Sequence, residues 1–568
     1  MSDDAPLPRS PVERIKERSR FLRGSIADGL HDVSTGALAE DDTQLTKFHG
    51  IYQQDDRDLR PERARKKMEK AFSFMARLRI PGGVVTSAQW LALDRIADAR
   101  ANGTLRITTR QTIQFHGIIK SNLKRALQDI NAALLDTIAA CGDVNRNVIA
   151  TANPDESAAH ADVVAAARAI SAHLAPRSRA YHEIWLDDEL VAGGEPESEP
   201  LYGALYLPRK FKIAIAVPPR NDVDVFAHEV GLIATVENGR VVGYNVAVGG
   251  GMGMTHGEPH TYPRLGEVIG WCSTAQAIDV CEKILTVQRD FGNRADRRQA
   301  RMKYLIAARG LDWFRAQVEE RLGYPFAPAR PYAFDGTGDR LGWREDAAGR
   351  AHFTLHVENG RVVDRKGVAL RTGLAEIARV HHGNFVMTTN QNIIIAGIPA
   401  DARAGVAALL DSHGLANPSG GLRRNAMACV ALPTCGLALA ESERYLPTLV
   451  TKLETLLQQA GLAQDEIVIR MTGCPNGCAR PYLAEIGLVG RNPGLYNLHL
   501  GAAFDGTRLN RLYRKDLDEA GILAALAPMF SAYARQRQDG ERFGDFAIRA
   551  GFVPGGPDAP RQFHEAAA

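Results

Sequence analysis

The sequence predicts an α+β fold made of two similar halves related by a pseudo-twofold axis. The main observation is an internal repeat: LRITTRQTIQFHGI at 105–118 matches FVMTTNQNIIIAGI 280 positions later. A second pair follows in the same order, RNVIATANP at 146–154 and RNAMACVALP at 424–433, at an offset of 278. Two ordered correspondences at nearly one offset indicate a duplicated unit.

Local patterns supply both kinds of element. Alternating β-favouring residues predict strands at 104–119, 211–217, 240–248, 384–397 and 484–500. Helices are predicted at 86–101, 275–288 and 443–460, the last from leucines at helical spacing before Gly461. Strands and helices therefore occur in both halves.

Composition limits the class of protein. The chain has 568 residues, 45% hydrophobic and 24% charged, which is typical of a globular protein with about three packed units. Its net charge of +3 gives no reason to expect nucleic acid or a membrane surface as partner. No apolar run has the length of a spanning helix, and the first residues lack the apolar region of a signal peptide. We expect a cytoplasmic protein.

Four of the seven cysteines form a constellation: C-x5-C at Cys429 and Cys435, then C-x3-C at Cys474 and Cys478, with thirty-eight residues between the pairs. Four thiolates match the ligand demand of a [4Fe–4S] cluster. The neighbouring Pro and Gly residues predict turns whose amides point at sulfur.

Two other interpretations of these cysteines stay open on spacing alone, a structural zinc site and unliganded thiols. Structural zinc sites favour C-x2-C pairs, which the chain lacks, so the spacing favours iron–sulfur. The isolated Cys141, Cys272 and Cys281 are interpreted as inert buried thiols.

Basic residues recur in segments that otherwise look buried. Lys210 and Lys212 lie on the same side of a probable strand start, and Arg77 precedes a Pro-Gly-Gly turn. Arg146 lies in the second repeated element, and Arg106, Arg110 and His116 share one strand. On composition alone a solvated surface charge is the simpler explanation for each.

The motif TGCPNGC at 472–478, with the upstream C-x5-C, resembles the signature of the siroheme and [4Fe–4S] sulfite and nitrite reductase family. The segments FHGIYQQDDR at 48–57, PGGVV at 81–85, YLPRKFK at 206–212 and GDF at 544–546 resemble its NADPH-dependent sulfite reductase branch, so the resemblance covers nearly the whole chain. It implies a three-lobed molecule with ferredoxin-like half-domains at 66–140 and 346–420. The molecule is completed by three further parts. They are an N-terminal arm at 1–65, which is irregular by its composition, a siroheme and sulfite-binding domain at 141–345, and an iron–sulfur and siroheme domain at 421–568.

The resemblance also implies roles for single residues. All four clustered cysteines bind the [4Fe–4S] cluster, and Cys478 also ligates the siroheme iron. The residues around sulfite are Arg77, Arg146, Lys210 and Lys212. The siroheme contacts are Arg106, Thr108, Arg110, Gln114, His116 and Gln391, with His116 expected to bind a siroheme carboxylate and not the iron.

The implied reaction is the six-electron reduction of sulfite to sulfide. The glycine-rich segment 249–253 fails G-x-G-x-x-G because Met254 occupies the last glycine position, so we expect no NADPH or flavin site in this chain. The resemblance implies a separate NADPH-dependent flavoprotein alpha subunit with FAD and FMN, docking partly on the arm. The alternatives are a ferredoxin-dependent sulfite or nitrite reductase and, from another class, a zinc-stabilised binding protein without redox activity.

Overall fold

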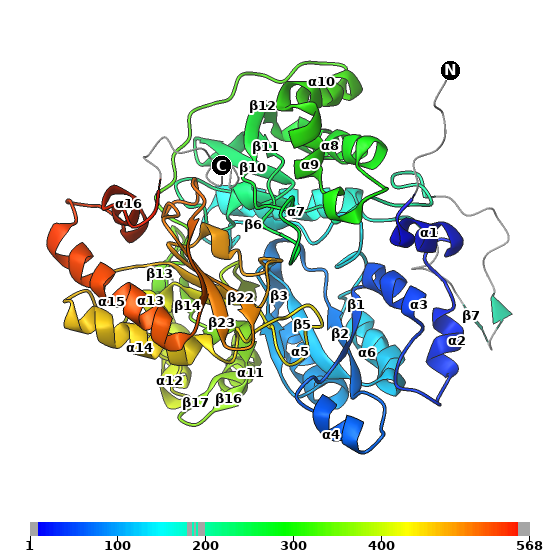
Figure 1. Ribbon diagram of the computed structural model, residues 1–568, viewed down its shortest axis with the longest axis horizontal. Helices are drawn as coiled ribbons and strands as arrows, with labels where there is room; N and C mark the ends of the chain where they lie inside the picture. Colours follow the sequence, from blue (N-terminus) through cyan, green and yellow to red (C-terminus); the bar gives the residue numbers. More distant parts are fainter. Residues whose placement is uncertain (1–8, 179–184, 187–188, 191–198, 555–568) are drawn as a thin grey trace.

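The computed structural model describes residues 9–178, 185–186, 189–190 and 199–554. Its three largest hydrophobic cores correspond to three lobes (Figure 1). The green lobe, residues 230–322, lies at the top of the view, the blue and cyan N-terminal part lies below it, and the orange and red C-terminal part lies beside them. The predicted α+β, three-lobed architecture is therefore confirmed.

The middle core is shared by two five-stranded half-sheets with the same strand order. The first comprises β1 (Ile51–Asp55), β2 (Phe72–Arg77), β5 (Ile113–Ile118), β4 (Leu105–Ile107) and β15 (Arg361–Val362). The second comprises β13 (Gly342–Glu345), β14 (Ala351–Leu355), β19 (Ile393–Ile398), β18 (Asn384–Met387) and β3 (Val84–Thr86). Their helices are α5 (Ser87–Arg100), α6 (Lys120–Ala132), α11 (Leu370–Val380) and α12 (Arg403–Ser412).

Each half-sheet is completed by an edge strand from the other half. β3 comes from the first half and pairs with β18, whereas β15 comes from the second and pairs with β4. The chain crosses over at Gly83 and Gly360, which have φ of +74° and +72°. A Cβ on Gly83 would lie 2.6 Å from the carbonyl oxygen of Met387, and one on Gly360 would lie 2.2 Å from that of Ile107. Ile107 and Met387 are equivalent in the repeat, so the crossing itself is pseudo-symmetric.

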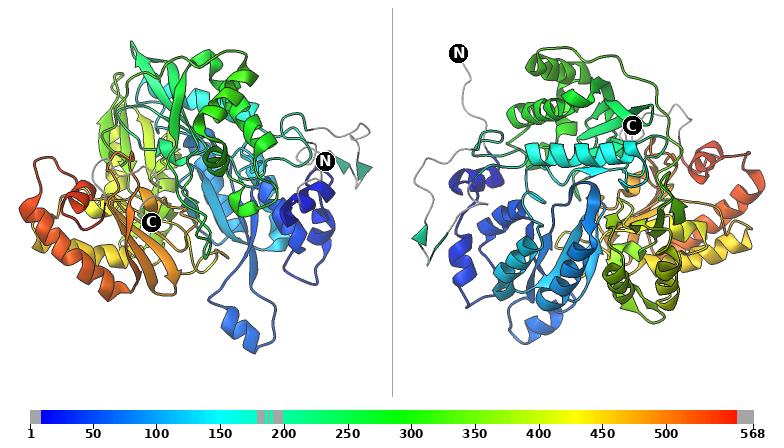
Figure 2. Two further views of the ribbon diagram at one scale, coloured as in Figure 1. Left: turned by 45° about the horizontal axis from the view of Figure 1, so that its top comes forward. Right: turned by 180° about the vertical axis from the view of Figure 1, so that it is seen from behind.

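A second pair of sheets repeats the same relationship. One comprises β6 (Ile149–Ala150), β9 (Ile213–Ala216), β10 (Val230–Glu237), β11 (Arg240–Val248) and β12 (Glu267–Ser273). The other comprises β20 (Ala426–Ala428), β21 (Ile469–Thr472), β22 (Ile486–Asn492), β23 (Leu495–Leu500) and β24 (Arg511–Leu517). Helices packed on them include α7 (Ala158–His173), α8 (Ala277–Phe291), α14 (Leu446–Gln459) and α15 (Glu519–Gln536). Figure 2 shows the two sheets in separate lobes, green and orange.

The pseudo-axis is marked by a buried ion pair between equivalent residues. Asp224 and Arg480 lie 256 positions apart, both have left-handed backbone geometry, and Arg480 Nε is bonded to Asp224 Oδ2. Arg480 also donates to the carbonyl oxygens of Thr109 and Thr389, each at 3.2 Å, which are equivalent residues of the two half-sheets. One side chain therefore connects both pairs of sheets.

The predicted helices and strands are confirmed, except that 104–119, 384–397 and 484–500 are each two strands joined by a turn. The prediction of an irregular N-terminal arm is wrong for its described part. That part contains β1 and four short helices, α1 (Pro11–Arg18), α2 (Ile26–His31), α3 (Glu40–Leu45) and α4 (Arg60–Arg65). Each helix is too short to show a periodicity; α1 and α3 each have two buried residues, and α2 and α4 have none. None of the described helices is long and apolar enough to span a bilayer.

The chain crossing gives a stability prediction. Gly360→Ala places a methyl group against a backbone carbonyl at a positive φ, and we expect it to lower the free energy of unfolding by more than about 3 kcal/mol. The matched control is Gly367→Ala, where φ is +81° but no atom lies within 4 Å. There we expect only the backbone cost of about 1 kcal/mol. Thermal unfolding of both variants measures the difference, and equal losses would contradict the crossing geometry.

Candidate functional site

The two cysteine pairs are brought together by neighbouring parallel strands. Cys429 directly follows β20, and Cys474 follows β21 by one residue. β20 and β21 pair in parallel, and the amide of Cys429 donates to the carbonyl of Met471 at 3.2 Å. Because parallel strands end at the same sheet edge, pairs separated by thirty-eight residues meet there.

The four thiols share one electrostatic environment. Burial and the proximity of Cys478 raise the pKa of the other three, that of Cys474 to about 12. Amide groups donate to sulfur as predicted: Gly473 N to Cys429 Sγ at 3.3 Å and Asn476 Nδ2 to Cys474 Sγ at 3.6 Å. No group of His, Cys, Asp or Glu in the described part of the chain is arranged to hold a single metal ion. The four cysteines are electrostatic neighbours at the ends of two paired strands.

Two of the predicted cations, Arg77 and Lys210, are electrostatic neighbours of Cys478. Cys141, Tyr52 and Cys478 together raise the pKa of Arg77 against the effect of its burial, and Cys478 opposes in part the lowering of the Lys210 pKa by burial, so both cations lie near Cys478. Arg77 ends β2 and donates to Cys141 Sγ at 3.3 Å. Arg146 is buried, and its Nε donates to the carbonyl of Gly142 at 2.7 Å.

Lys210 and Lys212 precede β9 and lie in an excess of positive charge. Burial, with Arg209 and Arg301 close by, lowers the pKa of Lys210 to about 7. Burial, Lys210 and Arg301 lower the pKa of Lys212 further. Arg301 itself is paired with Glu229. A bound anion would relieve this repulsion and restore the charge of both lysines.

The predicted siroheme contacts are also brought together, on β4–β5 and the equivalent turn of the second half. Arg106 donates to Glu443 at 2.8 Å and to the carbonyl of Ala428 at 2.9 Å, and Gln391 donates to the same carbonyl at 2.9 Å. The Thr108 hydroxyl accepts from the amide of Arg110 at 3.1 Å. The Gln114 side-chain oxygen accepts from Arg77 Nη2 at 2.6 Å.

Several buried polar atoms here have no hydrogen-bond partner among the described residues. They are His116 Nδ1 and Nε2, Arg110 Nε and Gln391 Oε1. Burial lowers the pKa of His116 well below its ordinary value and that of Arg110 to about 9. Buried polar groups are normally satisfied, so a cluster of orphans points to a polar group that fills the site. These residues therefore fit an anionic macrocycle such as siroheme.

Sequence reasoning missed three features of the site. Cys141 is buried, as expected, but its bond to Arg77 places it at the site. Glu443 pairs with Arg106 and Arg361, and nothing in its local sequence indicates this. The glycine-rich segment 249–253 leads into Met254, whose amide donates to the carbonyl of Pro475 at 2.9 Å, so that this segment lies against the second cysteine motif.

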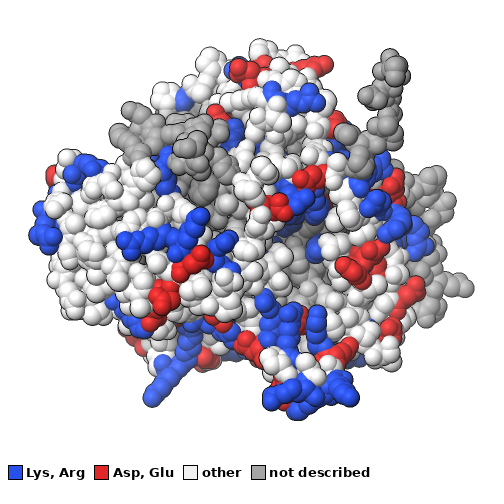
Figure 3. All heavy atoms as spheres, viewed as in Figure 1, with Lys and Arg blue, Asp and Glu red and all other residues white. Residues whose placement is uncertain are grey.

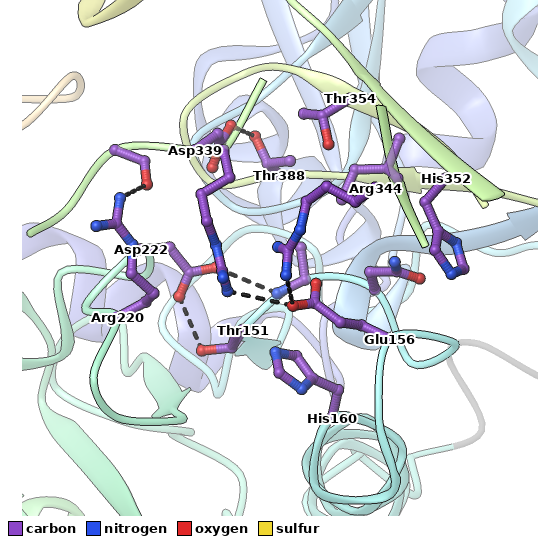
Figure 4. Close-up of a pocket in the computed structure, with 15 residues that line it drawn as sticks. Thr151, Glu156, His160, Arg220, Asp222, Asp339, Arg344, His352, Thr354 and Thr388 are labelled. Carbon is purple, nitrogen blue, oxygen red and sulfur yellow. Dashed lines mark hydrogen bonds and ion pairs between the residues drawn. The ribbon is translucent and has the colours of Figure 1, made fainter. Parts of the chain in front are cut away.

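A pocket lies at the position that pseudo-symmetry relates to the cysteine site, and its empty space, with the part open to solvent included, is about 490 Å³ (Figure 4). In it Thr151, Asp222 and Thr354 stand at the positions equivalent to Cys429, Cys478 and Arg77. Its polar and charged side chains bond to one another. The Thr151 hydroxyl donates to the Asp222 carboxylate at 2.8 Å, and Arg344 pairs with Glu156 at 2.6 Å. This pocket has neither the thiols nor the surplus of cations of the cysteine site.

Two family models match the chain. "Nitrite/Sulfite reductase ferredoxin-like half domain" matches residues 66–133 and 344–413, the two half-sheets. "Nitrite and sulphite reductase 4Fe-4S domain" matches residues 165–326, the sheet of β9–β12. The cysteines lie outside that match, beside the sheet of β20–β24, which has the same strand arrangement as the sheet of β6 and β9–β12.

The relatives cover the full chain. Proteins named "Sulfite reductase [NADPH] hemoprotein beta-component" from Myxococcus xanthus, Methylobacterium sp. (strain 4-46) and Shouchella clausii are 57%, 59% and 55% identical. The alignments span 98%, 98% and 96% of this chain and 99%, 93% and 96% of the relatives. The solved structure of Mycobacterium tuberculosis NirA protein aligns with a TM-score of 0.77 and 25% identity, covering 96% of this chain and 97% of that one. The chain belongs to the nitrite and sulfite reductase family, among the sulfite reductase [NADPH] hemoprotein beta-components.

Proposed function

We propose that this chain reduces sulfite to sulfide, taking up six electrons and six protons and releasing three water molecules. The observation that carries the proposal is the surplus of buried cations facing Cys478, beside a four-thiol site. Siroheme and a [4Fe–4S] cluster supply the one-electron chemistry when bound, because side chains store no electrons. The matching family and the relatives' names support this reaction over a zinc-stabilised binding protein.

We assign the metal ligands to the four clustered cysteines. Cys429, Cys435 and Cys474 would hold the cluster, and Cys478 would be a ligand to both cofactors. Cys478 suits the shared role because its thiol neighbours the other three and also the cations of the anion site. The edge of the siroheme would be lined by six polar side chains, those of His116, Arg110, Gln391, Arg106, Thr108 and Gln114.

Arg77, Arg146, Lys210 and Lys212 are assigned to sulfite. The arginines stay protonated, and their guanidinium groups bind the oxygen atoms of sulfite through charge-assisted hydrogen bonds of fixed direction. The lysines release protons more readily, because their pKa values are lowered by burial and by neighbouring cations. They are therefore the proposed proton donors to the oxygens that leave as water.

The electrons come from outside the chain. We propose a flavoprotein alpha subunit carrying FAD and FMN, which is supported by the word "beta-component" in the names of the relatives. The cytoplasm is the proposed location, since free thiols persist in a reducing compartment and the described cysteines form no disulfide. A ferredoxin-dependent reductase of the same family is the remaining alternative.

The first test is the purified holoprotein. We expect about five irons per chain, four of them non-heme, and a siroheme absorption spectrum. With reduced methyl viologen, the product from sulfite should be sulfide at six electrons each. A colourless protein containing zinc would refute the function, and a strong preference for nitrite would refute the substrate.

Lys212→Ala tests the anion site. We expect the variant to retain both cofactors, because Lys212 is not a metal ligand, but to turn over sulfite at least about tenfold more slowly. The control is Lys283→Ala on α8, a lysine in ion pairs with Asp279 and Glu282 at the surface. Steady-state assays with reduced viologen compare the two. Parental turnover in Lys212→Ala would remove Lys212 from the anion site.

The pH dependence tests Lys210. Its pKa of about 7 in the protein alone means that it loses its charge as pH rises, and bound anionic siroheme moves this loss to higher pH. We expect kcat/KM for sulfite to fall on the alkaline side, at or above pH 7. In Lys210→Arg the fall should move upward by more than about one pH unit, because guanidinium stays protonated. Ionisation of sulfite is common to both proteins, so superimposable profiles would exclude Lys210 as the titrating group.

A further inference from the structure

Glu229 is a fully buried glutamate whose two carboxylate oxygens differ in their contacts. Its Oε1 accepts from Arg301 Nε at 2.8 Å and also from Arg301 Nη2. Its Oε2 has no hydrogen-bond partner among the described residues. Buried polar atoms are normally satisfied, because an unpaired one lowers the stability of the fold. The unpaired oxygen therefore needs an explanation other than stability.

Strand pairing places Glu229 beside Lys212. Each of the two residues directly precedes a strand, Lys212 before β9 and Glu229 before β10, and these strands pair in parallel with Ile213 opposite Val230. The amide of Val230 donates to the carbonyl of Lys212 at 3.1 Å, so the pairing extends to these positions. Side chains in register on neighbouring strands lie on the same face of a sheet. The charge of Glu229 accordingly opposes the lowering of the Lys212 pKa by burial.

Glu229 is the acid among the charged groups of the described residues that act most strongly on Lys212. The other groups are basic and come from four parts of the chain: Lys210 on the same segment, His228 before β10, Arg110 in the turn between β4 and β5, and Arg301 before α9 (Met302–Arg309). On the face shown in Figure 3, acidic groups lie beside many of the basic groups at the surface, where salt also screens the charges. A buried lysine has only its fixed neighbours.

The glycine-rich segment 249–253 makes room for the pair of Glu229 and Arg301. Arg301 Nη2 also donates to the carbonyl of Gly250 at 3.4 Å. A Cβ on Gly251 would lie 2.5 Å from the same nitrogen. A glycine is needed there because only a residue without a side chain lets the guanidinium lie against the backbone. The segment that fails the nucleotide-binding pattern thus has a role in holding Arg301.

Pseudo-symmetry supplies a comparison within the chain. The offset of 256 positions that relates the ion pair on the pseudo-axis also relates Glu229 to Glu485 and Lys212 to Val468. Both oxygens of Glu485 accept from backbone amides, that of Val468 at 2.9 Å and that of Gly544 at 2.8 Å. Where no lysine stands beside it, a glutamate at this position is satisfied by the backbone. The contacts of Glu229 with basic groups therefore belong to the anion site and not to the shared scaffold.

We propose that Glu229 is a positioning residue for sulfite reduction: one carboxylate oxygen fixes Arg301, and the charge on the other supports the ammonium form of Lys212, the proton donor. This inference rests on the proposed function, because Lys212 acts as a donor only in that reaction. Each oxygen of sulfite that leaves as water takes two protons and two electrons, and the electrons come from the external donor. Lys212 gives its protons one at a time and regains each from solvent. Glu229 itself forms and breaks no bond.

Two variants of Glu229 separate charge from shape. Glu229→Gln removes the charge but keeps an oxygen for Arg301, whereas Glu229→Asp keeps the charge on a shorter side chain. The matched control is Glu485→Gln, the same substitution at the equivalent buried position. The holoenzymes are assayed for sulfide formation with reduced methyl viologen between about pH 6 and 9, because the pH dependence of kcat reports groups in the complex with substrate. Cofactor absorption and thermal unfolding are measured on the same preparations.

We expect the alkaline fall of kcat in Glu229→Gln to move to lower pH by about one unit, because the Lys212 ammonium loses the negative charge beside it. KM for sulfite should stay at the parental value or fall, since the anion site gains net positive charge. A purely structural loss would instead lower kcat at every pH and raise KM. Glu229→Asp and Glu485→Gln should both keep the parental pH dependence.

The contrary outcomes are equally definite. Ionisation of sulfite is common to all variants, so superimposable profiles of the parent and Glu229→Gln overturn the proposal. An equal shift in Glu485→Gln or in Glu229→Asp overturns it as well. A Glu229→Gln protein without cofactors or without a folding transition also overturns it, because the glutamate then serves assembly. A parent that forms no sulfide with viologen overturns the proposed function instead, so the two failures are distinguishable.

Discussion

The buried carboxylate of Asp224 is the interaction on which the arrangement of the lobes depends. It pairs with Arg480 and, at 2.6 Å, with Arg470, and all three side chains are almost fully buried. Removing one partner of such a pair costs about 3–5 kcal/mol, because the remaining charges stay in a poorly solvated site. Arg480 continues to the turns of both half-sheets, and it lies two residues after Cys478. The ion pair that holds the sheets together thus also fixes the loop of the shared thiolate.

The pseudo-symmetry produces two equivalent sites, which differ in the side chains that line them. One has Cys429, Cys478 and Arg77; at the same positions the other has Thr151, Asp222 and Thr354. In the second site the acids accept hydrogen bonds and the arginines pair with carboxylates, so the charges cancel locally. The scaffold is therefore common to both sites. Function resides in a few substitutions at equivalent positions, as the contrast of Arg110 with Asn390 already indicates in the sequence.

The repeat, the positions of the strands and the [4Fe–4S] interpretation of the cysteine pairs were predictable because each leaves a pattern over many residues, whereas the turns that divide 104–119, 384–397 and 484–500 into hairpins were not predicted. The strand exchange was not, since β15 has two residues and β3 has three, too few for any periodicity. The residues on the pseudo-axis could not be found either. Asp224 and Arg480 look like ordinary surface residues, and only the packing of four sheets around them makes their charges buried. Arg106 and Gln391 were predicted near the siroheme, but their bonds to one carbonyl, that of Ala428, depend on both halves.

The surplus of positive charge at the cysteine site has a consequence for stability. Burial and the nearby Arg301 lower the affinity of Lys210 and Lys212 for protons, and Glu229, which pairs with Arg301, compensates only part of this charge. A protein selected for stability alone would place carboxylates there, as the pseudo-symmetric pocket does with Glu156 and Asp222. Burying like charges without a counterion lowers the stability of the fold. Binding of the anionic siroheme and sulfite reduces this repulsion, so it contributes favourable free energy. Anion affinity and the mutual repulsion of the buried cations are therefore two aspects of one arrangement of charges.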